Sequence, residues 1–189
     1  MNYMVQIKNI WKFSKTLVNI LLIKVLNFQG RISINGRSVI PFGTIASVEK
    51  NSFLSIQKHV NVRKGCKISV HEEGQLKIEE GVSFNYNCII TAYNKILIGE
   101  GTIIGPNVCI YDHDHEFGKG VNIHEGKYKM DSVIIGKNVW IGANTVLLRG
   151  TNIGDNCVIA AGSIVKGEME SNTLLIQKRK NEYKKIEEI

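Results

Sequence analysis

The stretch Ile135-Gly136-Lys137-Asn138-Val139-Trp140-Ile141-Gly142-Ala143-Asn144-Thr145-Val146-Leu147 places an aliphatic residue at every sixth position. The same count runs through residues 34–166 and groups in threes. Its beats are Ile34, Ile40, Ala46; Ile56, Val62, Ile68; Ile78, Phe84, Ile90; Ile98, Ile104, Ile110; Ile135, Ile141, Leu147; and Ile153, Ile159, Val165. Fixed-period repetition is typical of a solenoid whose units bury apolar residues against their neighbours. The sequence therefore predicts an all-β solenoid of about six coils, each an 18-residue unit of three short strands.

The residues between the beats fit such coils. In three hexads the aliphatic residue is followed by Gly and then by Asn two positions later: Ile104-Gly105-Pro106-Asn107, Ile135-Gly136-Lys137-Asn138 and Ile153-Gly154-Asp155-Asn156. Gly and Asn both tolerate the positive φ of a tight corner.

The cysteines fit the same pattern. Cys66, Cys88 and Cys157 fall at the compact fourth position after a beat, where a thiol acts as a small buried hydrophobe, and Cys109 falls one place later. The sequence holds no CxxC pair to indicate zinc, and its cysteines are too dispersed to indicate a disulfide framework. A reducing, cytoplasmic compartment is expected, and no secretory signal with a cleavage site is visible.

The first 28 residues follow a different period. Apolar residues recur at helical spacing, with Lys8, Lys12, Lys15 and Asn19 on the other side. We predict one amphipathic helix over residues 1–28. Asn19, Lys24 and Asn27 interrupt the apolar run, so a membrane span is not expected. Of two interpretations, a cap over the open first coil is favoured over docking to an anionic membrane surface.

Charge is unevenly distributed. The formal net charge is +7, no acidic residue precedes Glu49, and Lys178-Arg179-Lys180 lies in a basic tail over residues 171–189. A basic excess suits nucleic acid, membrane phosphates or an anionic cofactor. Nucleic acid is the weakest of these, because no recognised binding motif accompanies the charge.

The hexads that begin at Ile98, Ile135 and Ile141, with Tyr111-Asp112-His113-Asp114-His115 between the first two, resemble the hexapeptide-repeat acyltransferases. The closest resemblance is to sugar and capsular-polysaccharide O-acetyltransferases and to the galactoside and maltose acetyltransferases. The resemblance implies a left-handed parallel β-helix over residues 29–170, with an excursion loop at 111–133. It also implies a homotrimer with acetyl-CoA bound between adjacent subunits.

The resemblance also implies a catalytic histidine five positions after the aliphatic residue that opens the interrupted hexad. That residue is Ile110, so His115 is the candidate general base. An imidazole can take the proton of a hydroxyl as its oxygen attacks a thioester carbonyl, with no covalent enzyme intermediate. His113 is expected to point to the opposite side of an extended segment. Asp112 and Asp114 either orient an imidazole or solvate the loop; Asp112 and His113 are also candidates for acceptor binding.

A second match is Phe84-Asn85-Tyr86-Asn87, which resembles the Asn-aromatic-Asn hexad of the same family. Carried over, Asn85 would hydrogen-bond the acceptor or the thioester oxygen beside His115, as a catalytic and substrate-binding residue. Tyr86 would stack on a sugar. The alternative is that Asn85 and Asn87 are corner residues.

For the cofactor, Val139–Ala143 and Ala160–Ser163 resemble stretches that present backbone amides and small side chains to pantetheine. The resulting candidates for cofactor contact are Trp140, Gly142, Ala143, Ala161, Gly162, Lys166, Lys178, Arg179 and Lys180. The last three suit the phosphates of CoA. They stand where many relatives carry a Gly-x-Pro-Ala turn, so the resemblance gives no exact phosphate contacts.

The predicted function is therefore acetyl-CoA-dependent O-acetylation of a saccharide, such as a capsular, cell-wall or lipopolysaccharide precursor. The expected location is cytoplasmic, with peripheral contact at the inner membrane face, and no metal or nucleic acid is expected. A nearby alternative is another acceptor, such as an aminosugar nitrogen, serine or an antibiotic hydroxyl. A β-helix carbonic anhydrase needs three converging histidines, and the spacing of His71, His113, His115 and His124 gives no obvious triad. A non-catalytic scaffold is the third alternative.

Overall fold

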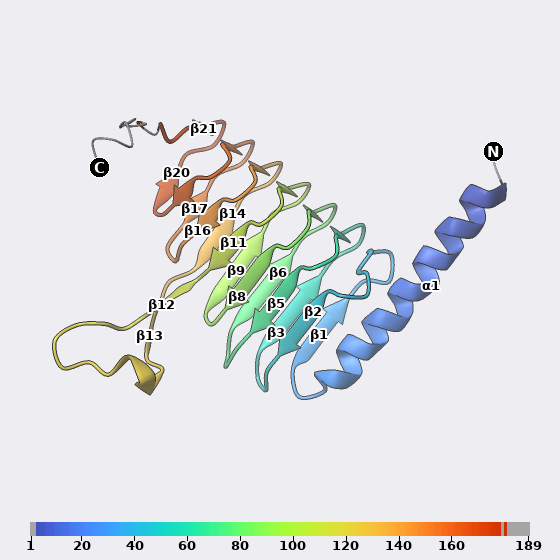
Figure 1. The fold of residues 1–189 in the computed structure, drawn as a ribbon, viewed down its shortest axis with the longest axis horizontal. Coiled ribbons are helices and arrows are strands. Elements are labelled where there is room, and N and C mark those ends of the chain that lie inside the picture. Colours follow the sequence, from blue (N-terminus) through green and yellow to red (C-terminus); the bar gives the residue numbers. More distant parts are fainter. Residues whose placement is uncertain (1–2, 179, 181–189) are drawn as a thin grey trace, which may run out of the picture.

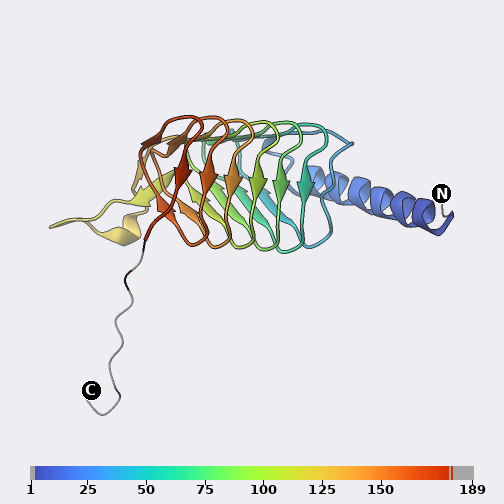
Figure 2. The same ribbon diagram turned by 90° about the horizontal axis from the view of Figure 1, so that it is seen from above.

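The computed structural model describes residues 3–178 and 180, with side chains from residue 14 onward. A long helix, α1 (Tyr3–Leu26), precedes a solenoid of parallel strands. The coils stack along one axis, with α1 at the N-terminal end (Figure 1, Figure 2). The predicted β-solenoid of about six coils with one N-terminal helix is confirmed.

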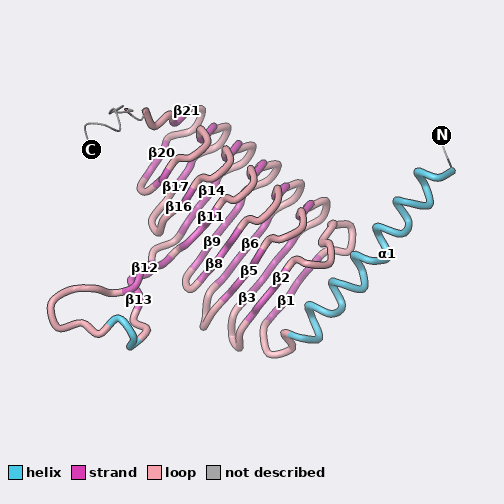
Figure 3. The backbone as a smooth tube through the Cα atoms, in the orientation of Figure 1, coloured by secondary structure: helices cyan, strands magenta, loops and turns pink. Residues whose placement is uncertain are grey.

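Three parallel sheets form the sides of the solenoid, and from β3 to β19 each coil contributes one strand to each side in turn (Figure 3). The first sheet holds β1 (Arg31–Ile34), β3 (Phe53–Ile56), β6 (Gln75–Ile78), β9 (Lys95–Ile98), β14 (Val133–Ile135), β17 (Asn152–Ile153) and β20 (Glu168–Met169). The second holds β4 (Asn61–Val62), β7 (Ser83–Phe84), β10 (Ile103–Ile104), β15 (Trp140–Ile141), β18 (Val158–Ile159) and β21 (Leu174–Leu175). The third holds β2 (Ile45–Val48), β5 (Lys67–Val70), β8 (Ile89–Ala92), β11 (Cys109–Tyr111), β16 (Val146–Leu147) and β19 (Ile164–Val165).

Two edges of this prism matter for function. We call the corners between the second and third sheets the small-residue edge; they are residues 63–66, 85–88, 105–108, 142–145 and 160–163. At the other edge the chain passes from a strand of the third sheet to the first-sheet strand of the next coil. We call the corners there the hairpin edge. It comprises residues 49–52, 71–74, 93–94, 112–132, 148–151 and 166–167.

The hexad beats form the core. Every one of them is buried except Ala46, which is partly buried. The coils are longer than predicted in the N-terminal half, where Ile34 pairs with Ile56 and Ile56 with Ile78, spacings of 22 residues (56 − 34 and 78 − 56). Four-residue strands in the first and third sheets account for the extra length. The predicted spacing of 18 is found between Ile135 and Ile153 (153 − 135).

The corners confirm one part of the sequence pattern and correct another. Asn107, Asn138 and Asn156 have φ of 57°, 53° and 56°, as expected. The preceding glycines have a different role, because a Cβ on Gly105 would lie 2.7 Å from the backbone N of Ala143 in the next coil. Glycine is therefore required there by the close approach of neighbouring backbones.

The four cysteines are free. Cys66, Cys88 and Cys157 are buried in the core, as predicted, while Cys109 is partly exposed.

Helix α1 covers the open side of the first coil through polar side chains. The Asn19 amide donates to the carbonyls of Ile40 and Pro41, both at 3.1 Å. The Asn27 amide donates to the carbonyl of Ala46 at 3.1 Å, and its oxygen accepts from the backbone N–H of Val48 at 2.8 Å. These bonds satisfy backbone groups of the first coil, which has no preceding coil to pair with.

The orientation of α1 differs from the one that its apolar pattern suggested. Asn19, expected on the side away from the coil, is buried against it together with Thr16, Ile20 and Ile23. From residue 14 onward, the exposed apolar residues of the segment are Leu17, Val18, Leu21, Leu22, Val25, Leu26 and Phe28. Within the part of the chain that the structure describes, no helix has the length and apolarity to cross a bilayer.

Replacing Asn27 by alanine should lower the free energy of unfolding by about 2 kcal/mol, because it strands the Val48 N–H and the Ala46 carbonyl without their partner. Thermal unfolding monitored by circular dichroism checks this. Lys24→Ala is the matched control, because Lys24 is an exposed residue of the same helix. Equal melting temperatures for the two variants would contradict a capping role for Asn27.

Candidate active site

The chain leaves the solenoid once between repeats, after β11 at the hairpin edge. It forms an antiparallel hairpin of β12 (His113–His115) and β13 (Tyr128–Met130), with the short 3-10 helix η1 (Ile123–Glu125) between them. The hairpin and its loop project from the side of the prism (Figure 1). This is the interrupted hexad that the sequence indicated as the reactive segment.

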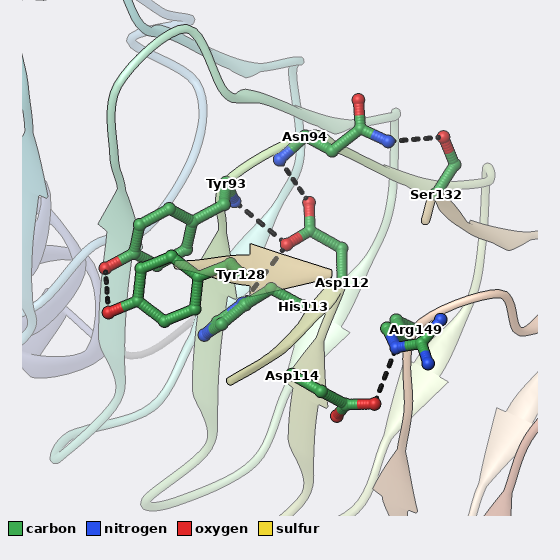
Figure 4. Close-up of polar contacts among 8 residues, drawn as sticks. All are labelled: Tyr93, Asn94, Asp112, His113, Asp114, Tyr128, Ser132 and Arg149. Carbon is green, nitrogen blue, oxygen red and sulfur yellow. Dashed lines mark hydrogen bonds and ion pairs between the residues drawn. The ribbon is translucent and has the colours of Figure 1, made fainter. Parts of the chain in front are cut away.

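Asp112 anchors the base of the hairpin. Its side chain is fully buried, and its two oxygens accept from the backbone N–H groups of Tyr93 (2.9 Å) and Asn94 (2.8 Å), as Figure 4 shows. It also contacts Nδ1 of His113 at 3.3 Å. The expected contact of Asp112 with an acceptor does not fit this placement, because the carboxylate does not reach solvent. Asp112 instead positions the hairpin.

His113 and His115 lie on the same side of the hairpin. Both rings contact the ring of Tyr128, with centroids 5.3 Å and 4.7 Å from it. The expectation that they point to opposite sides is wrong, because residues two apart on a strand share a face. They differ in access: the His113 side chain is 14% exposed, whereas His115 is exposed.

The aromatic contacts continue along the hairpin edge toward the N-terminus. The ring centroid of Tyr93 lies 4.4 Å from that of His113 and 4.5 Å from that of Tyr128. The Tyr93 ring also stacks on the His71 ring, with centroids 4.6 Å apart. We call His71, Tyr93, His113, Tyr128 and His115 the aromatic ladder. Partial burial and a 3.4 Å hydrogen bond to Tyr128 raise the pKa of the Tyr93 hydroxyl, so Tyr93 remains a neutral donor. These ring contacts join both strands of the hairpin to Tyr93 and His71 of the solenoid, so the ladder holds the hairpin in place.

The ladder ends at Glu49, which accepts from Nδ1 of His71 at 2.7 Å. A backbone hydrogen bond from Glu72, followed by the contact with His71, lowers the pKa of the Glu49 carboxyl. Sequence reasoning missed Tyr93 and Tyr128. A usable signal was present for Tyr93, because Glu49, His71 and Tyr93 are spaced by one 22-residue coil (71 − 49 and 93 − 71).

Asp114 pairs with Arg149, a residue that sequence reasoning also missed. Nε of Arg149 lies 2.5 Å from Oδ2 of Asp114 (Figure 4), and the two side chains are 24% and 37% exposed. Arg149 belongs to the next corner of the same edge. The pair therefore links the middle residue of β12 to the solenoid. Asp114 neither orients an imidazole nor simply solvates the loop.

The remaining candidates lie mainly on the small-residue edge. Asn85 and Tyr86 form its corner in the third coil, Gly142 and Ala143 in the fifth, and Ala161 and Gly162 in the sixth. A Cβ on Gly142 would lie 2.5 Å from the backbone N of Ala161, and the Gly162 N–H donates to the Ala143 carbonyl at 2.7 Å. Trp140, on the neighbouring β15, is 57% exposed. These residues give a surface of backbone and small side chains beside an indole.

Asn85 and Tyr86 are both exposed. The Asn85 oxygen accepts from the backbone N–H of Tyr86 at 2.9 Å, and the Arg63 guanidinium lies 5.6 Å from the Tyr86 ring centroid. The corner residue with positive φ is Asn87, with φ of 60°. Asn85 does not have a positive φ, so the turn does not need an asparagine there for that reason.

Two thiols lie directly beneath Asn85. Cys66 and Cys88 both donate to its carbonyl, at 3.1 Å and 3.4 Å. Contact with the thiol of Cys88 lowers the pKa of Cys66, and contact with Cys66 together with burial raises the pKa of Cys88.

The structure thus brings the candidates together as two groups. His115, His113 and Asp112 lie on the hairpin edge together with exposed Lys166, whereas Asn85, Tyr86 and the small residues lie on the other edge, across the third sheet. Lys178 and Lys180 are exposed beyond β21, and Arg179 lies outside the described residues. Among the described residues, no group of three potential metal ligands is found.

Comparison with known proteins agrees with this architecture. Residues 132–166 match a family model described as the hexapeptide repeat of succinyl-transferase. An Escherichia coli (strain K12) protein, WbbJ, provisionally named a lipopolysaccharide biosynthesis O-acetyl transferase, is 31% identical over 59% of this chain and 61% of its own length. Galactoside O-acetyltransferase of the same strain is 36% identical over 48% of this chain and 44% of its own. The chain thus spans about half to three-fifths of these relatives.

A solved structure supports the same assignment. The maltose O-acetyltransferase from Clostridium difficile 630 superimposes with a TM-score of 0.56 at 34% identity, covering 65% of this chain and 64% of that one. Residues 132–166 carry the hexapeptide repeat, and the resemblance of the chain to the hexapeptide-repeat acyltransferases is confirmed.

Proposed function

We propose that the chain is an acetyltransferase that transfers the acetyl group of acetyl-CoA to a hydroxyl of a saccharide. The observation that carries the proposal is His115, an exposed imidazole held against Tyr128 on a hairpin anchored by Asp112 and Arg149. Similarity to proteins named as O-acetyltransferases supports the reaction and the class of acceptor.

In the proposed reaction His115 acts as the general base. It takes the proton of the acceptor hydroxyl as the oxygen attacks the thioester carbonyl, which gives a tetrahedral intermediate. Collapse of this intermediate breaks the carbon–sulfur bond, and the departing thiolate takes the proton from the imidazolium. The products are the acetyl ester and CoA, and the histidine returns to its starting state.

The two groups of candidate residues argue for a site shared between subunits. One chain offers His115 on the hairpin edge, and a second chain would offer Asn85 and the donor surface on its small-residue edge. A ring of identical subunits brings such unlike edges together at every interface. The proposed assembly is a homotrimer in which pantetheine lies along Gly142, Ala143, Ala161 and Gly162, beside Trp140.

The basic tail is proposed to contact the phosphates of the cofactor. Lys178 and Lys180 are exposed, and Gln177, just before them, is fixed by two hydrogen bonds with the backbone of Ile164, at 3.0 Å and 2.7 Å. The tail therefore begins beside the last strand of the third sheet, β19.

Acetyl-CoA incubated with the full chain and a panel of saccharides, aminosugars and serine tests the function. Release of CoA thiol and NMR of the products would be followed together. We expect acetyl esters on a saccharide. Acetylation confined to an amine or to serine would replace the acceptor class, and the absence of both transfer and CoA binding would favour a scaffold.

A further inference from the structure

Helix α1 turns its apolar side away from the solenoid. Its outer stripe, which we define as Val18, Leu21, Leu22, Val25 and Leu26, has side chains that are 43–77% exposed. Phe28, just beyond the helix, is 78% exposed. A contiguous apolar surface of this kind on a polar protein marks a site of interaction.

The rotation of the helix is fixed by its inner side. Asn19 and Asn27 together make four hydrogen bonds to backbone groups of residues 40, 41, 46 and 48. Turning the outer stripe inward would break all four and bury apolar side chains against unpaired peptide groups. The outward position of the stripe therefore follows from the way α1 closes the first coil.

The charges around the stripe favour one kind of partner. Residues 1–48 contain six basic residues and no acidic one. The 3.6-residue period of a helix places exposed Lys24 on one flank of the stripe and exposed Lys15 at its N-terminal end, on the same face as Leu22 and Leu26. Apolar side chains flanked by lysines suit a helix lying in the plane of an anionic lipid surface, where the lysine stems extend to the headgroups. A second copy of the helix fits less well, because it would bring like charges together.

We propose that the outer stripe of α1 docks on the surface of an anionic phospholipid bilayer. The helix lies across the N-terminal end of the solenoid (Figure 1, Figure 2), so the coils would stack away from the lipid. The hydrogen bonds from Asn19 and Asn27 to the first coil hold the C-terminal half of the helix beside the solenoid and outside the bilayer core. This inference does not depend on the reaction proposed above.

Co-sedimentation of the full-length protein with vesicles tests the proposal. Vesicles of phosphatidylglycerol and phosphatidylcholine should bind the protein, and vesicles of phosphatidylcholine alone should bind it at least tenfold more weakly. The triple variant Val18→Ser, Leu21→Ser, Val25→Ser should lose about 100-fold in affinity for the anionic vesicles. Lys24→Glu should lose about tenfold, and more salt should weaken the wild type.

The matched control is the double variant Leu174→Ser, Ile176→Ser, which removes two side chains of similar exposure (57% and 59%) at the opposite end of the solenoid. It should bind vesicles like the wild type. Circular dichroism melts should show that the stripe variant is folded, because its residues point outward. Equal vesicle binding by the stripe variant and the wild type would overturn the proposal. The proposal would also be overturned if the wild-type protein did not bind vesicles but self-associated through the stripe, because a second copy would then be the partner.

Discussion

Replacing His115 by alanine should lower kcat for acetyl transfer by about 10²-fold or more, the usual contribution of a general base. The imidazole is exposed beside Tyr128 and is the more accessible of the two histidines on β12. Binding of CoA should change little, because the proposed donor surface lies on the other edge of the prism. Steady-state kinetics together with calorimetric titration of CoA would measure the two effects separately.

His113→Ala is the matched control. His113 sits two positions away on the same strand, but its side chain is 14% exposed and packs against Tyr93 and Tyr128. Its loss should reduce stability of the hairpin and leave kcat within about tenfold of the wild type. A larger fall in kcat for His113→Ala than for His115→Ala would show that His113, and not His115, is the general base.

Two inactive variants should restore activity when their subunits are mixed. His115→Ala removes the proposed base, and Ala161→Trp covers the donor surface with an indole at an exposed position. In a mixed ring, one chain can supply an intact hairpin edge and its neighbour an intact small-residue edge. Random mixing of equal amounts should recover about a quarter of wild-type activity, since each intact edge is present with a chance of about one half.

The measurement requires unfolding and refolding the two variants together, with light scattering to establish the size of the assembly. The control is a single chain carrying both substitutions, mixed with His115→Ala, which can build no intact site. If the mixed variants assemble but recover no more activity than this control, the site is completed within one chain. Activity from a wild-type monomer would lead to the same conclusion.

The fold followed from the sequence because the hexad is both the repeat and the core. Each coil buries its own beats against the equivalent beats of its neighbours, so the pattern needs no long-range information. The length of the individual coils did not follow. Strands extended by two residues, as in β1 and β5, preserve the alternation of buried and exposed residues and leave the beats in register.

The helix was harder to orient for a specific reason. Helical periodicity identifies an apolar side but does not say which side faces the protein. Asn19 and Asn27 decide the matter here, because the backbone groups of the open first coil need polar partners more than they need apolar cover.

The candidate site was predictable to the level of single residues but not to the level of their surroundings. The position of His115 relative to Ile110 is a local property of the chain, and the corner that carries Asn85 is another. The contacts of Tyr128 with His115 and of Arg149 with Asp114 join residues 13 and 35 positions apart (128 − 115 and 149 − 114). Those contacts depend on how the excursion folds back, which no period in the sequence encodes.

The regular stacking of the coils sets the distance between the first coil and the hairpin. Neighbouring parallel strands are about 4.8 Å apart, so the three steps from β1 to β9 in the first sheet separate the first coil from the hairpin coil by roughly 14 Å. With α1 resting on lipid, an acceptor anchored in the bilayer would have to reach at least that far before its hydroxyl met His115. The number of coils below the hairpin would then select acceptors by the length of the chain that carries them, and inserting one coil would shift that preference by about 5 Å.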